Sequence, residues 1–523
     1  MVPQEYVSLK MERAHTVVVT RWCSNKLLIL AFHKFSMRPL LTALLTILCI
    51  PVFAQNSISW LATAPVAHKI YGNLHPRIKL DKYNNPMVVW GDDGGKAYFA
   101  KWGGESFSTP IVISQSGVNV FATSWAGPDI AAHGDTVYVT YKQIPEEKNH
   151  IYIKHSYDGG VNFSAAAQVD SEYNYITRFP TVTTDENGNP FVTYMKVDKG
   201  YDNAHYVVAR SDDMGESFFK DTLASINSGD KVCDCSPAAL VASGSAGVLL
   251  YRNNLGGLRN IWGGVSNNGC KTFNNALRMD STDYVPSTCP ASGPDGVIVG
   301  DTLYSVYMSG SNDNSLVYLS KLSLSYPSLT TSEVTGTITG VPKQNYPRIS
   351  GIGSAAGIVW TQSSGGNNIV CLVVTDDLTK GFPKVYDTVA EGVMLNADVA
   401  IGGGFIYVVW EDQVTRSVMY RRGVYYKKNK VVDNTSILIG SQNPTMKYFT
   451  INMPDILSCV MTDSTGREYE MDIAYPKNVN ICQVNTDEME EGEYGVKVWD
   501  KDGRIYNARI RLKGIKRNKD KED

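Results

Sequence analysis

The stretch Ser156-Tyr-Asp-Gly-Gly-Val-Asn-Phe163 decides the fold, because it recurs as Ser211-Asp-Asp-Met-Gly-Glu-Ser-Phe218. Both copies read Ser-x-Asp-x-Gly-x-x-Phe and both follow a strand-like run. The aspartate can accept hydrogen bonds from N–H groups of the turn, and the glycine tolerates a positive φ. The phenylalanine can then fold back between the strands. The pattern predicts a tight turn between antiparallel strands, which we call a Ser-x-Asp turn.

Looser copies of this turn follow the same frame elsewhere in the chain. They are Ala100-Lys-Trp-Gly-Gly-Glu-Ser-Phe107, Ser266-Asn-Asn-Gly-Cys-Lys-Thr-Phe273 and Thr375-Asp-Asp-Leu-Thr-Lys-Gly-Phe382. The phenylalanines at 107, 163, 218 and 273 are separated by 56, 55 and 55 residues. A fixed period of this length predicts a repeat architecture.

A second signal runs in step with the turns: a proline, an apolar run, a glycine-containing turn and a β-rich run that ends in an aromatic residue. These units start at Pro76, Pro128, Pro180, Pro237, Pro290, Pro347 and, without proline, Ala397. Each unit predicts four strands, with the Ser-x-Asp turn between the third and the fourth, and such units close radially into a propeller. We predict an all-β fold with a seven-bladed β-propeller over residues 55–436; six blades is the alternative count.

Ring closure usually combines strands from both ends of the chain in one blade. The run Ile58-Ser-Trp-Leu-Ala-Thr-Ala64 is strand-like and precedes the first unit. We predict that it completes the blade near residues 420–432.

The first 54 residues predict a targeting segment. Residues 37–54 contain one basic residue, a short apolar run and a Val-Phe-Ala end, which is typical of a signal peptide. The true start is then Met37, and the mature chain begins near Gln55. The apolar run is too short to span a bilayer, so we expect no transmembrane span in the mature chain.

Composition limits the function classes. The net charge of −3 and the pI near 6.3 disfavour nucleic acid as a partner. An odd number of cysteines, seven, follows the signal peptide. A Cys235–Cys289 or Cys233–Cys289 bridge is expected, because these residues shortly precede the prolines of adjacent units. The cysteines lack zinc-site spacing, so we predict no metal site and no cofactor.

Residues 437–513 carry neither the turn nor the period. They contain Asn443-Pro444, Thr462-Asp-Ser-Thr-Gly466 and the alternating run Gly492-Glu-Tyr-Gly-Val-Lys-Val498. Alternation with period two predicts the strands of a small C-terminal β-sandwich. The charged tail 514–523 is predicted to be disordered.

The Ser-x-Asp turns resemble the Asp box of sialidases and other BNR-repeat propellers. This resemblance implies a β-propeller whose Asp boxes lie on the face opposite the ligand site. It implies structural roles for Asp158, Gly160, Phe163, Asp213, Gly215 and Phe218. The motif indicates a fold and not an activity.

Residues 437–513 resemble the C-terminal sorting domain of the type IX secretion system of Bacteroidetes. The resemblance rests on the Asn-Pro start, the Asp-x-x-Gly turn and the Gly-x-Tyr-x-Val-x-Val run. It implies outer-membrane secretion machinery as a partner and a secreted or cell-surface location. The residues after Lys513 depart from the family, whose members usually end near this point.

A sialidase-like site requires three arginines around the substrate carboxylate, with an acid and a tyrosine nucleophile. Arg178-Phe-Pro180 resembles the Arg-Ile-Pro signature of that family, but it stands in the third unit rather than the first. The candidate ligand-binding residues, by position, are Arg178, Arg252, Arg348, Tyr346, Asp92 and Glu411. Alternatively, Arg77, Arg178 and Arg348 are ordinary polar residues at strand starts. We expect the three candidate arginines not to converge.

A polysaccharide lyase would need a histidine or tyrosine base, for which His75, His150, His155 and His205 are candidates. The favoured interpretation of all four is surface imidazole. We therefore predict a secreted or cell-surface propeller that binds a glycan or protein on the face opposite the Asp boxes. The alternatives are an enzyme acting on acidic sugars, either a sialidase-like glycosidase or a polysaccharide lyase, and a structural adhesin.

Overall fold

The computed structural model describes residues 22–23, 26–27 and 58–512, except 105, 172, 227–230, 312–313, 326–327, 336–342, 403, 426–447, 452–455, 475–481, 488 and 501–504. The predicted signal peptide, the boundary at 436 and the tail 514–523 lie outside these residues. The chain divides into two units, Met1–Gln55 and Asn56–Asp523. In the first unit, β1 (Trp22–Cys23) pairs with β2 (Lys26–Leu27).

Between residues 58 and 425 the described residues form seven antiparallel sheets, numbered here in chain order. Sheet 1 comprises β5 (Leu74–Leu80), β6 (Pro86–Gly91), β7 (Ala97–Lys101) and β8 (Ile111–Val112). Sheet 2 comprises β9 (Asn119–Val120), β10 (Asp129–His133), β11 (Thr136–Ile144), β12 (Ile151–Ser156) and β13 (Ala167–Gln168). Sheet 3 comprises β14 (Tyr175–Thr184), β15 (Pro190–Asp198), β16 (His205–Arg210) and β17 (Thr222–Leu223).

The next three sheets repeat the same order. Sheet 4 comprises β18 (Lys231–Val232), β19 (Ala239–Ser243), β20 (Ala246–Asn254), β21 (Ile261–Ser266) and β22 (Asn275–Arg278). Sheet 5 comprises β23 (Asp295–Val299), β24 (Thr302–Ser311), β25 (Asn314–Ser323) and β26 (Leu329–Glu333). Sheet 6 comprises β27 (Gln344–Ile352), β28 (Ala355–Ser364), β29 (Asn367–Thr375) and β30 (Asp387–Gly392).

Sheet 7 joins the two ends of this region. It comprises β31 (Met394–Gly402), β32 (Phe405–Asp412), β33 (Ser417–Tyr425), β3 (Ile58–Trp60) and β4 (Ala64–Pro65). Ile58 pairs with Tyr425, and Pro65 pairs with Met419. The predicted closure of the ring by the N-terminal run is confirmed.

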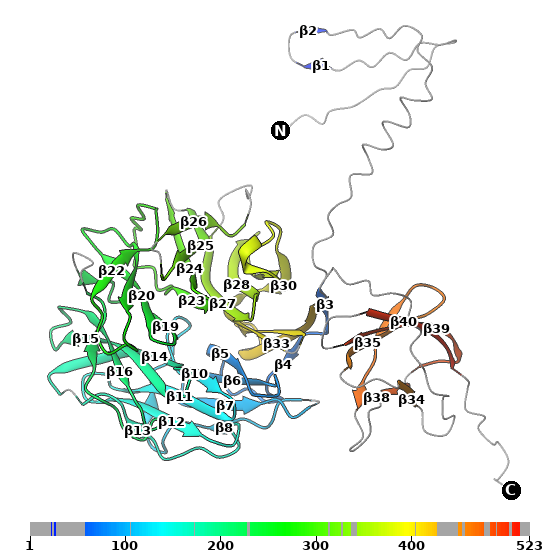
Figure 1. The fold of residues 1–523 in the computed structure, drawn as a ribbon, viewed down its shortest axis with the longest axis horizontal. Coiled ribbons are helices and arrows are strands. Elements are labelled where there is room, and N and C mark those ends of the chain that lie inside the picture. Colours follow the sequence, from blue (N-terminus) through cyan, green and yellow to red (C-terminus); the bar gives the residue numbers. More distant parts are fainter. Residues whose placement is uncertain are drawn as a thin grey trace. The chain divides into compact units, whose positions relative to one another are not determined.

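The innermost strands pack in a closed cycle, β5–β10–β14–β19–β23–β27–β31 and back to β5 (Figure 1). Because each sheet buries one face against each neighbouring sheet, the sheets radiate from a common axis, which is a β-propeller. The described chain contains no α-helix, and η1 (Leu378–Lys380) is a short 3-10 turn. No described helix is both long and apolar enough to cross a membrane.

The fifth unit starts later than predicted. Its inner strand β23 begins at Asp295, so Pro294, and not Pro290, is the equivalent of Pro128 before β10. The predicted Cys235–Cys289 bridge is nevertheless present, with Cα atoms 6.5 Å apart. The two cysteines do not occupy equivalent positions. They meet because the segment before β23 lies against the segment before β19.

The Ser-x-Asp turns have the expected hydrogen bonds. Oδ1 of Asp158 accepts from the main-chain N–H groups of Val161 (3.0 Å) and Asn162 (2.9 Å). The Ser156 hydroxyl accepts from Gly160 N at 2.8 Å. Asp213 accepts from Ser217 in the same way. Hydrogen bonds from the Ser217 side chain and main chain lower the pKa of Asp213 to about 2.

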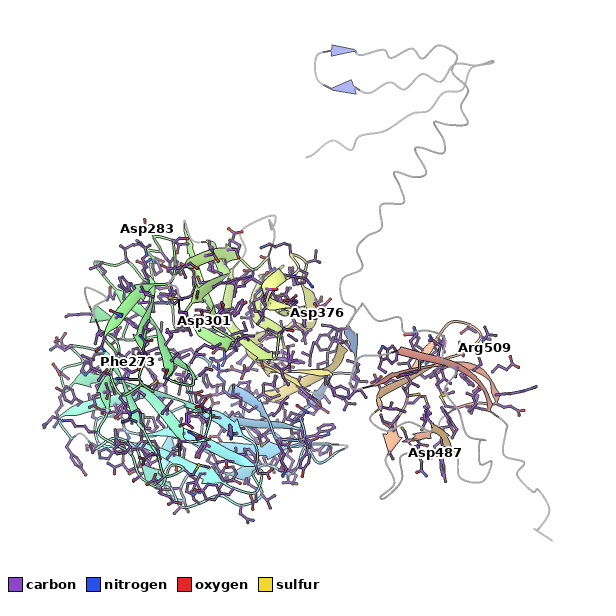
Figure 2. The ribbon with its side chains drawn as sticks, viewed as in Figure 1. Phe273, Asp283, Asp301, Asp376, Asp487 and Arg509 are labelled. Carbon is purple, nitrogen blue, oxygen red and sulfur yellow. A yellow bond between two sulfur atoms is a disulfide. The ribbon has the colours of Figure 1, made fainter. Side chains whose placement is uncertain are left out.

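The phenylalanines of these turns fill the space between sheets. Phe163 packs edge-on against Phe99, with ring centroids 5.0 Å apart, and Phe218 packs on the cluster beneath the next turn. In the third turn Asn268 takes the aspartate position, and Phe273 is again buried (Figure 2).

We expect Gly160→Ala to destabilise the protein more than Gly159→Ala. Both glycines have positive φ, +81° and +69°, so alanine costs about 1–2 kcal/mol at either position. A Cβ at Gly160 would lie 2.5 Å from the Phe99 ring, whereas one at Gly159 has no atom nearer than 3.7 Å. Overpacking adds about 1–3 kcal/mol at Gly160 alone. Urea denaturation of both variants measures the difference, and equal losses would contradict this geometry.

Antiparallel order places the connections of each sheet on two faces. Ser-x-Asp turns lie on one face, called the opposite face. The starts of the innermost strands and the turns between second and third strands lie on the other, called the mouth face. The turn Asp81–Asn85 belongs to the opposite face, because it joins the first two strands of sheet 1.

The C-terminal residues form two further sheets around their own core. One comprises β34 (Tyr448–Ile451), β38 (Cys482–Asn485) and β37 (Ile473–Ala474). The other comprises β36 (Glu468–Glu470), β35 (Ile456–Thr462), β39 (Gly492–Asp500) and β40 (Ile505–Leu512). Both contribute to one buried cluster that includes Phe449, Cys482, Met461 and Val496.

Candidate functional site

Four innermost strands carry a β-bulge at the mouth face. The residue inside each bulge is a non-glycine residue with positive φ, namely His75 (56°), Phe179 (52°), Tyr346 (51°) and Asn396 (41°). A bulge re-aims the side chain at that position. His75, Tyr346 and Asn396 line the cavity on the axis. Because the bulge recurs in four sheets, it belongs to the repeat and does not by itself mark a catalytic centre.

Aspartates next to the axis fasten sheets together. Asp129 accepts from Val182 N (2.9 Å), Asp295 from Ile349 N (3.0 Å) and Asp398 from Ile78 N (3.0 Å). Each bond joins one sheet to the next around the ring. The Asp398 bond joins sheet 7 to sheet 1 and so reinforces the closure.

Two arginines neutralise this acidic ring. Arg348 Nε lies 3.4 Å from Asp295 and 3.5 Å from Asp398. Burial by itself raises the pKa of Asp398, but Arg348 and Arg77 outweigh it and hold that pKa below its ordinary value. Burial, with the charge of Arg348, lowers the pKa of Arg77 to about 10. Arg348 is therefore part of a structural ion network.

Glu411 is also committed to this network. Its side chain is fully buried and accepts from His75 N (2.8 Å), Ser124 Oγ (2.8 Å) and Gln413 Nε2 (2.9 Å). Burial raises the pKa of Glu411. The carboxylate holds loops of different sheets and does not face a ligand, which corrects its predicted role.

The space on the axis is small. The cavity lined by His75, Arg348, Tyr346 and Asn396 measures about 30 Å³. One water needs about 10–15 Å³ measured in this way, so the cavity holds a few waters and no sugar ring. A glycan would have to bind away from the axis.

Arg252 and Asp92 also have structural partners. Arg252 is fully buried, and it donates to the main-chain oxygens of Arg259 (2.7 Å) and Met308 (2.7 Å). Asp92 accepts from Lys96 N (2.7 Å) and the Tyr98 hydroxyl (3.0 Å), which fixes a mouth-face turn. The predicted ligand-binding role of Arg252 is therefore wrong, because no exposed atom remains to meet a ligand.

Arg178 lies in a different environment, over sheets 2 and 3 at the mouth face. Its Nε lies 3.2 and 3.1 Å from the two carboxylate oxygens of Glu146. Its guanidinium lies 5.9 Å from the ring centroid of Tyr201, and the Tyr201 hydroxyl donates to Glu147. That hydrogen bond lowers the pKa of Glu147 and raises the pKa of Tyr201.

The contacts continue from Arg178 to a histidine. Neighbouring Thr177 donates to Asp170, and Asp170 also lies 3.0 Å from Nδ1 of His150. The ring of Tyr173 packs edge-on against His150, with centroids 5.0 Å apart. We call this group the Arg178 cluster; it comprises Glu146, Glu147, His150, Asp170, Tyr173, Thr177, Arg178 and Tyr201.

Two aromatic residues of the Arg178 cluster face solvent. Tyr173 is 73% exposed and Tyr201 is 45% exposed. Tyr201 and Asn203 have φ values of 62° and 53°, so the turn that carries them adopts a costly backbone conformation. Strained turns that present exposed aromatics occur at functional sites more often than elsewhere.

The three candidate arginines have no described partner in common. Arg178 pairs with Glu146, Arg252 bonds main-chain oxygens, and Arg348 pairs with Asp295 and Asp398. This separation agrees with the expectation that they do not converge.

The four histidines fall in different environments. His75 is 4% exposed at the axis. His155 is 7% exposed on the opposite face, where its ring stacks on Tyr157 and its Nε2 lies 3.3 Å from Glu216. Surface imidazole is therefore wrong for these two. His205 lies at the mouth face, with Nδ1 2.8 Å from Asn203 O.

Sequence reasoning missed Glu146, Glu147, Tyr173 and Tyr201. They stand in turns outside the repeat pattern, so no periodicity marks them. The available signal was their clustering in two turns that the repeat places side by side, after β11 and after β15.

No protein-family profile matches the chain, and no curated protein matches it. A solved structure of unknown function from Dyadobacter fermentans is 12% identical, with a TM-score of 0.43, and the match covers 61% of this chain and 98% of that chain. A GH93 α-L-arabinofuranosidase of Fusarium graminearum gives 14%, 0.41, 62% and 99%. A polysaccharide lyase of family PL25, an ulvan lyase, gives 10%, 0.44, 70% and 94%. Similarities this low assign no activity.

Proposed function

We propose that this chain is a secreted, seven-bladed Asp-box β-propeller that binds a glycan through the Arg178 cluster. The observation that carries the proposal is the pair of exposed tyrosines, Tyr173 and Tyr201, at the two ends of a continuous polar network. The C–H face of a sugar ring packs on an aromatic ring, while its hydroxyls bond to carboxylates and amides. An exposed aromatic pair rimmed by such groups is typical of a binding surface.

The charge of the cluster favours a neutral glycan. Arg178 is already paired with Glu146, and Glu147 adds a second carboxylate beside it. A sugar carboxylate would have to displace Glu146 and approach Glu147. The three separately engaged arginines also disfavour a sialidase, which needs them around one carboxylate.

A glycan array probed with the full chain tests this function. We expect binding to neutral oligosaccharides, with little response to sialosides. An array without any binding, or one confined to sialosides, would contradict the proposal.

One observation favours a lyase as the second candidate. Asp170 holds Nδ1 of His150, which leaves Nε2 as the nitrogen able to take a proton, beside Tyr173. In such a reaction a base removes the proton α to a uronate carboxylate, the bond to the leaving oxygen breaks, and a carbon–carbon double bond forms. An increase in ultraviolet absorbance with an acidic polysaccharide, lost in His150→Ala, would support this alternative.

We further propose that residues 437–513 form a C-terminal β-sandwich that acts as a type IX sorting domain. The two sheets around one core between residues 448 and 512 support the sandwich. The three motifs of the sequence support the sorting role, and they imply a cell-surface or extracellular location with the outer-membrane secretion machinery as partner.

A further inference from the structure

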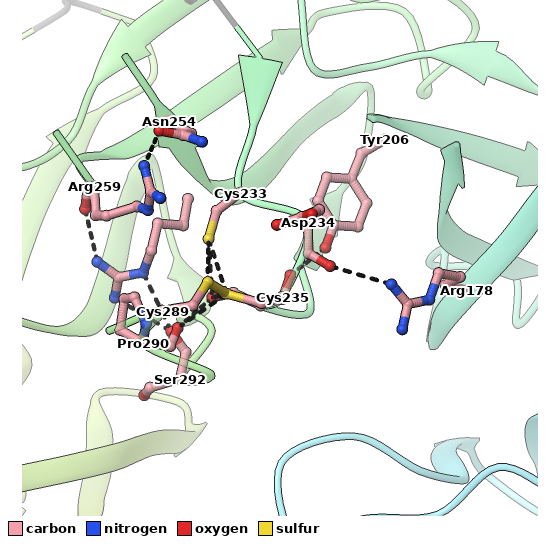
Figure 3. The surroundings of a disulfide bond; sticks show 12 residues. Arg178, Tyr206, Cys233, Asp234, Cys235, Asn254, Arg259, Cys289, Pro290 and Ser292 are labelled. Atoms are coloured by element: carbon pink, nitrogen blue, oxygen red, sulfur yellow. Dashed lines mark hydrogen bonds between the residues drawn. A yellow bond between two sulfur atoms is a disulfide. The ribbon is translucent and has the colours of Figure 1, made fainter. Parts of the chain in front are cut away.

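A third sulfur lies against the disulfide that joins sheets 4 and 5. Cys235 is bonded to Cys289, and Cys233 Sγ lies 3.1 Å from Cys235 Sγ and 3.3 Å from Cys289 Sγ (Figure 3). Cys233 is a free, buried thiol. A thiolate in contact with a disulfide is the starting arrangement for thiol–disulfide exchange.

The two bridged cysteines differ in exposure. Cys289 is exposed, whereas Cys235 is half-buried. Exchange is faster when the departing sulfur is the better stabilised thiolate, and water stabilises an exposed thiolate. Attack by Cys233 on Cys235, with Cys289 as the departing group, is therefore the favoured direction.

Contacts other than the disulfide hold the site together. The Ser236 hydroxyl donates to Pro290 O at 2.5 Å, and Cys233 N donates to Arg252 O at 2.8 Å. The two segments can therefore stay together when the bridge opens.

A buried cation lies beside the free thiol. The described hydrogen bonds of the Arg252 guanidinium go to main-chain oxygens and to no carboxylate. Burial lowers the pKa of Arg252, and the charge of Cys233 opposes that shift. A positive charge with no bonded carboxylate favours the thiolate form of a nearby cysteine.

We propose that Cys233, Cys235 and Cys289 form an intramolecular exchange site that frees Cys289 as a surface thiol open to covalent modification. The Cys233 thiolate attacks Cys235, the Cys233–Cys235 bond forms, and the Cys235–Cys289 bond breaks with its electron pair on Cys289. Cys289 takes up the proton that Cys233 lost. One disulfide and one thiol exist before and after the step, so it needs no oxidant or reductant.

Alkylation of the full native chain by iodoacetamide, without reductant, tests the exchange. The Cys289 thiolate displaces iodide and forms a carbon–sulfur bond. We expect peptide mapping to find alkylated Cys289, together with a peptide of Cys233 and Cys235 that is two hydrogens lighter than its reduced form. In Cys233→Ser, alkylation of Cys289 should fall by about tenfold or more, because no internal nucleophile remains.

Cys371→Ser is the matched control, because Cys371 is also a buried free cysteine but lies in sheet 6. It should leave alkylation of Cys289 unchanged. The wild-type map tests the proposal even if Cys233→Ser does not fold. Alkylation of Cys235 in place of Cys289, no alkylation of either, or a tightly held metal ion that protects all three cysteines would each overturn it.

Discussion

Replacing Asp398 by alanine should lower the free energy of unfolding by about 3–5 kcal/mol, the usual cost of removing one partner from a buried ion pair. Asp398 is 3% exposed, pairs with Arg348 and accepts from Ile78 N across the junction of sheets 7 and 1. Its loss leaves a buried guanidinium with one carboxylate fewer and a main-chain N–H unpaired. Urea denaturation followed by tryptophan fluorescence measures the effect.

Asp135→Ala is the matched control. Asp135 also pairs with a cation of another sheet, Lys82, but both side chains are about two-fifths exposed. An exposed pair contributes about 0–1 kcal/mol. Similar losses in the two variants would show that the axial network does not hold the ring.

The loss in Asp398→Ala should depend on pH. The pKa of Asp398 is lowered in the folded protein, so its charge stabilises the fold above the pKa of the unfolded chain, about 3.9. That contribution is lost as the pH falls through the lower, folded value. The gap between wild type and variant should therefore be full at neutral pH and shrink in acid.

Deleting residues 58–65 should remove more than about 5 kcal/mol, the lower end of the stability of a whole domain. These residues supply the outer strand of sheet 7, where Leu61 N donates to Arg422 O (2.9 Å) and Leu61 O accepts from Arg421 Nε (2.9 Å). Without them the main chain of β33 is an exposed edge, and an exposed edge promotes aggregation. Size-exclusion chromatography and thermal melting of the deleted chain would show the loss.

A peptide of residues 56–66 added in trans should restore the cooperative melt of the deleted chain, and a scrambled peptide should not. A deleted chain that melts like the wild type would contradict the role of β3 and β4 in closing the ring.

The repeat could be predicted from the sequence because its chemistry is local. Asp158 and Gly160 fold their turn through contacts within a few residues, so spacing alone marks them. Pro290 shows the limit of this reasoning. A second proline four residues later precedes the strand, and only packing against the neighbouring sheet selects between the two.

The candidate site could not be predicted in the same way. Arg178 was identified, but its partners Glu146 and Tyr201 come from turns of two different sheets. His75 was expected at the surface, yet the bulge buries it at the axis. Such contacts depend on how sheets meet, and the period of the sequence does not record that.

Affinity for the strongest glycan on the array, measured by titration calorimetry on the full chain, tests the central claim most directly. We expect Tyr201→Ala and Tyr173→Ala each to weaken binding about tenfold, which is about 1.4 kcal/mol. Tyr83→Ala is the matched control, because Tyr83 is 70% exposed but lies on the opposite face, and it should bind like the wild type. Unchanged affinity in both mouth-face variants, or an equal loss in Tyr83→Ala, would contradict a binding site at the Arg178 cluster.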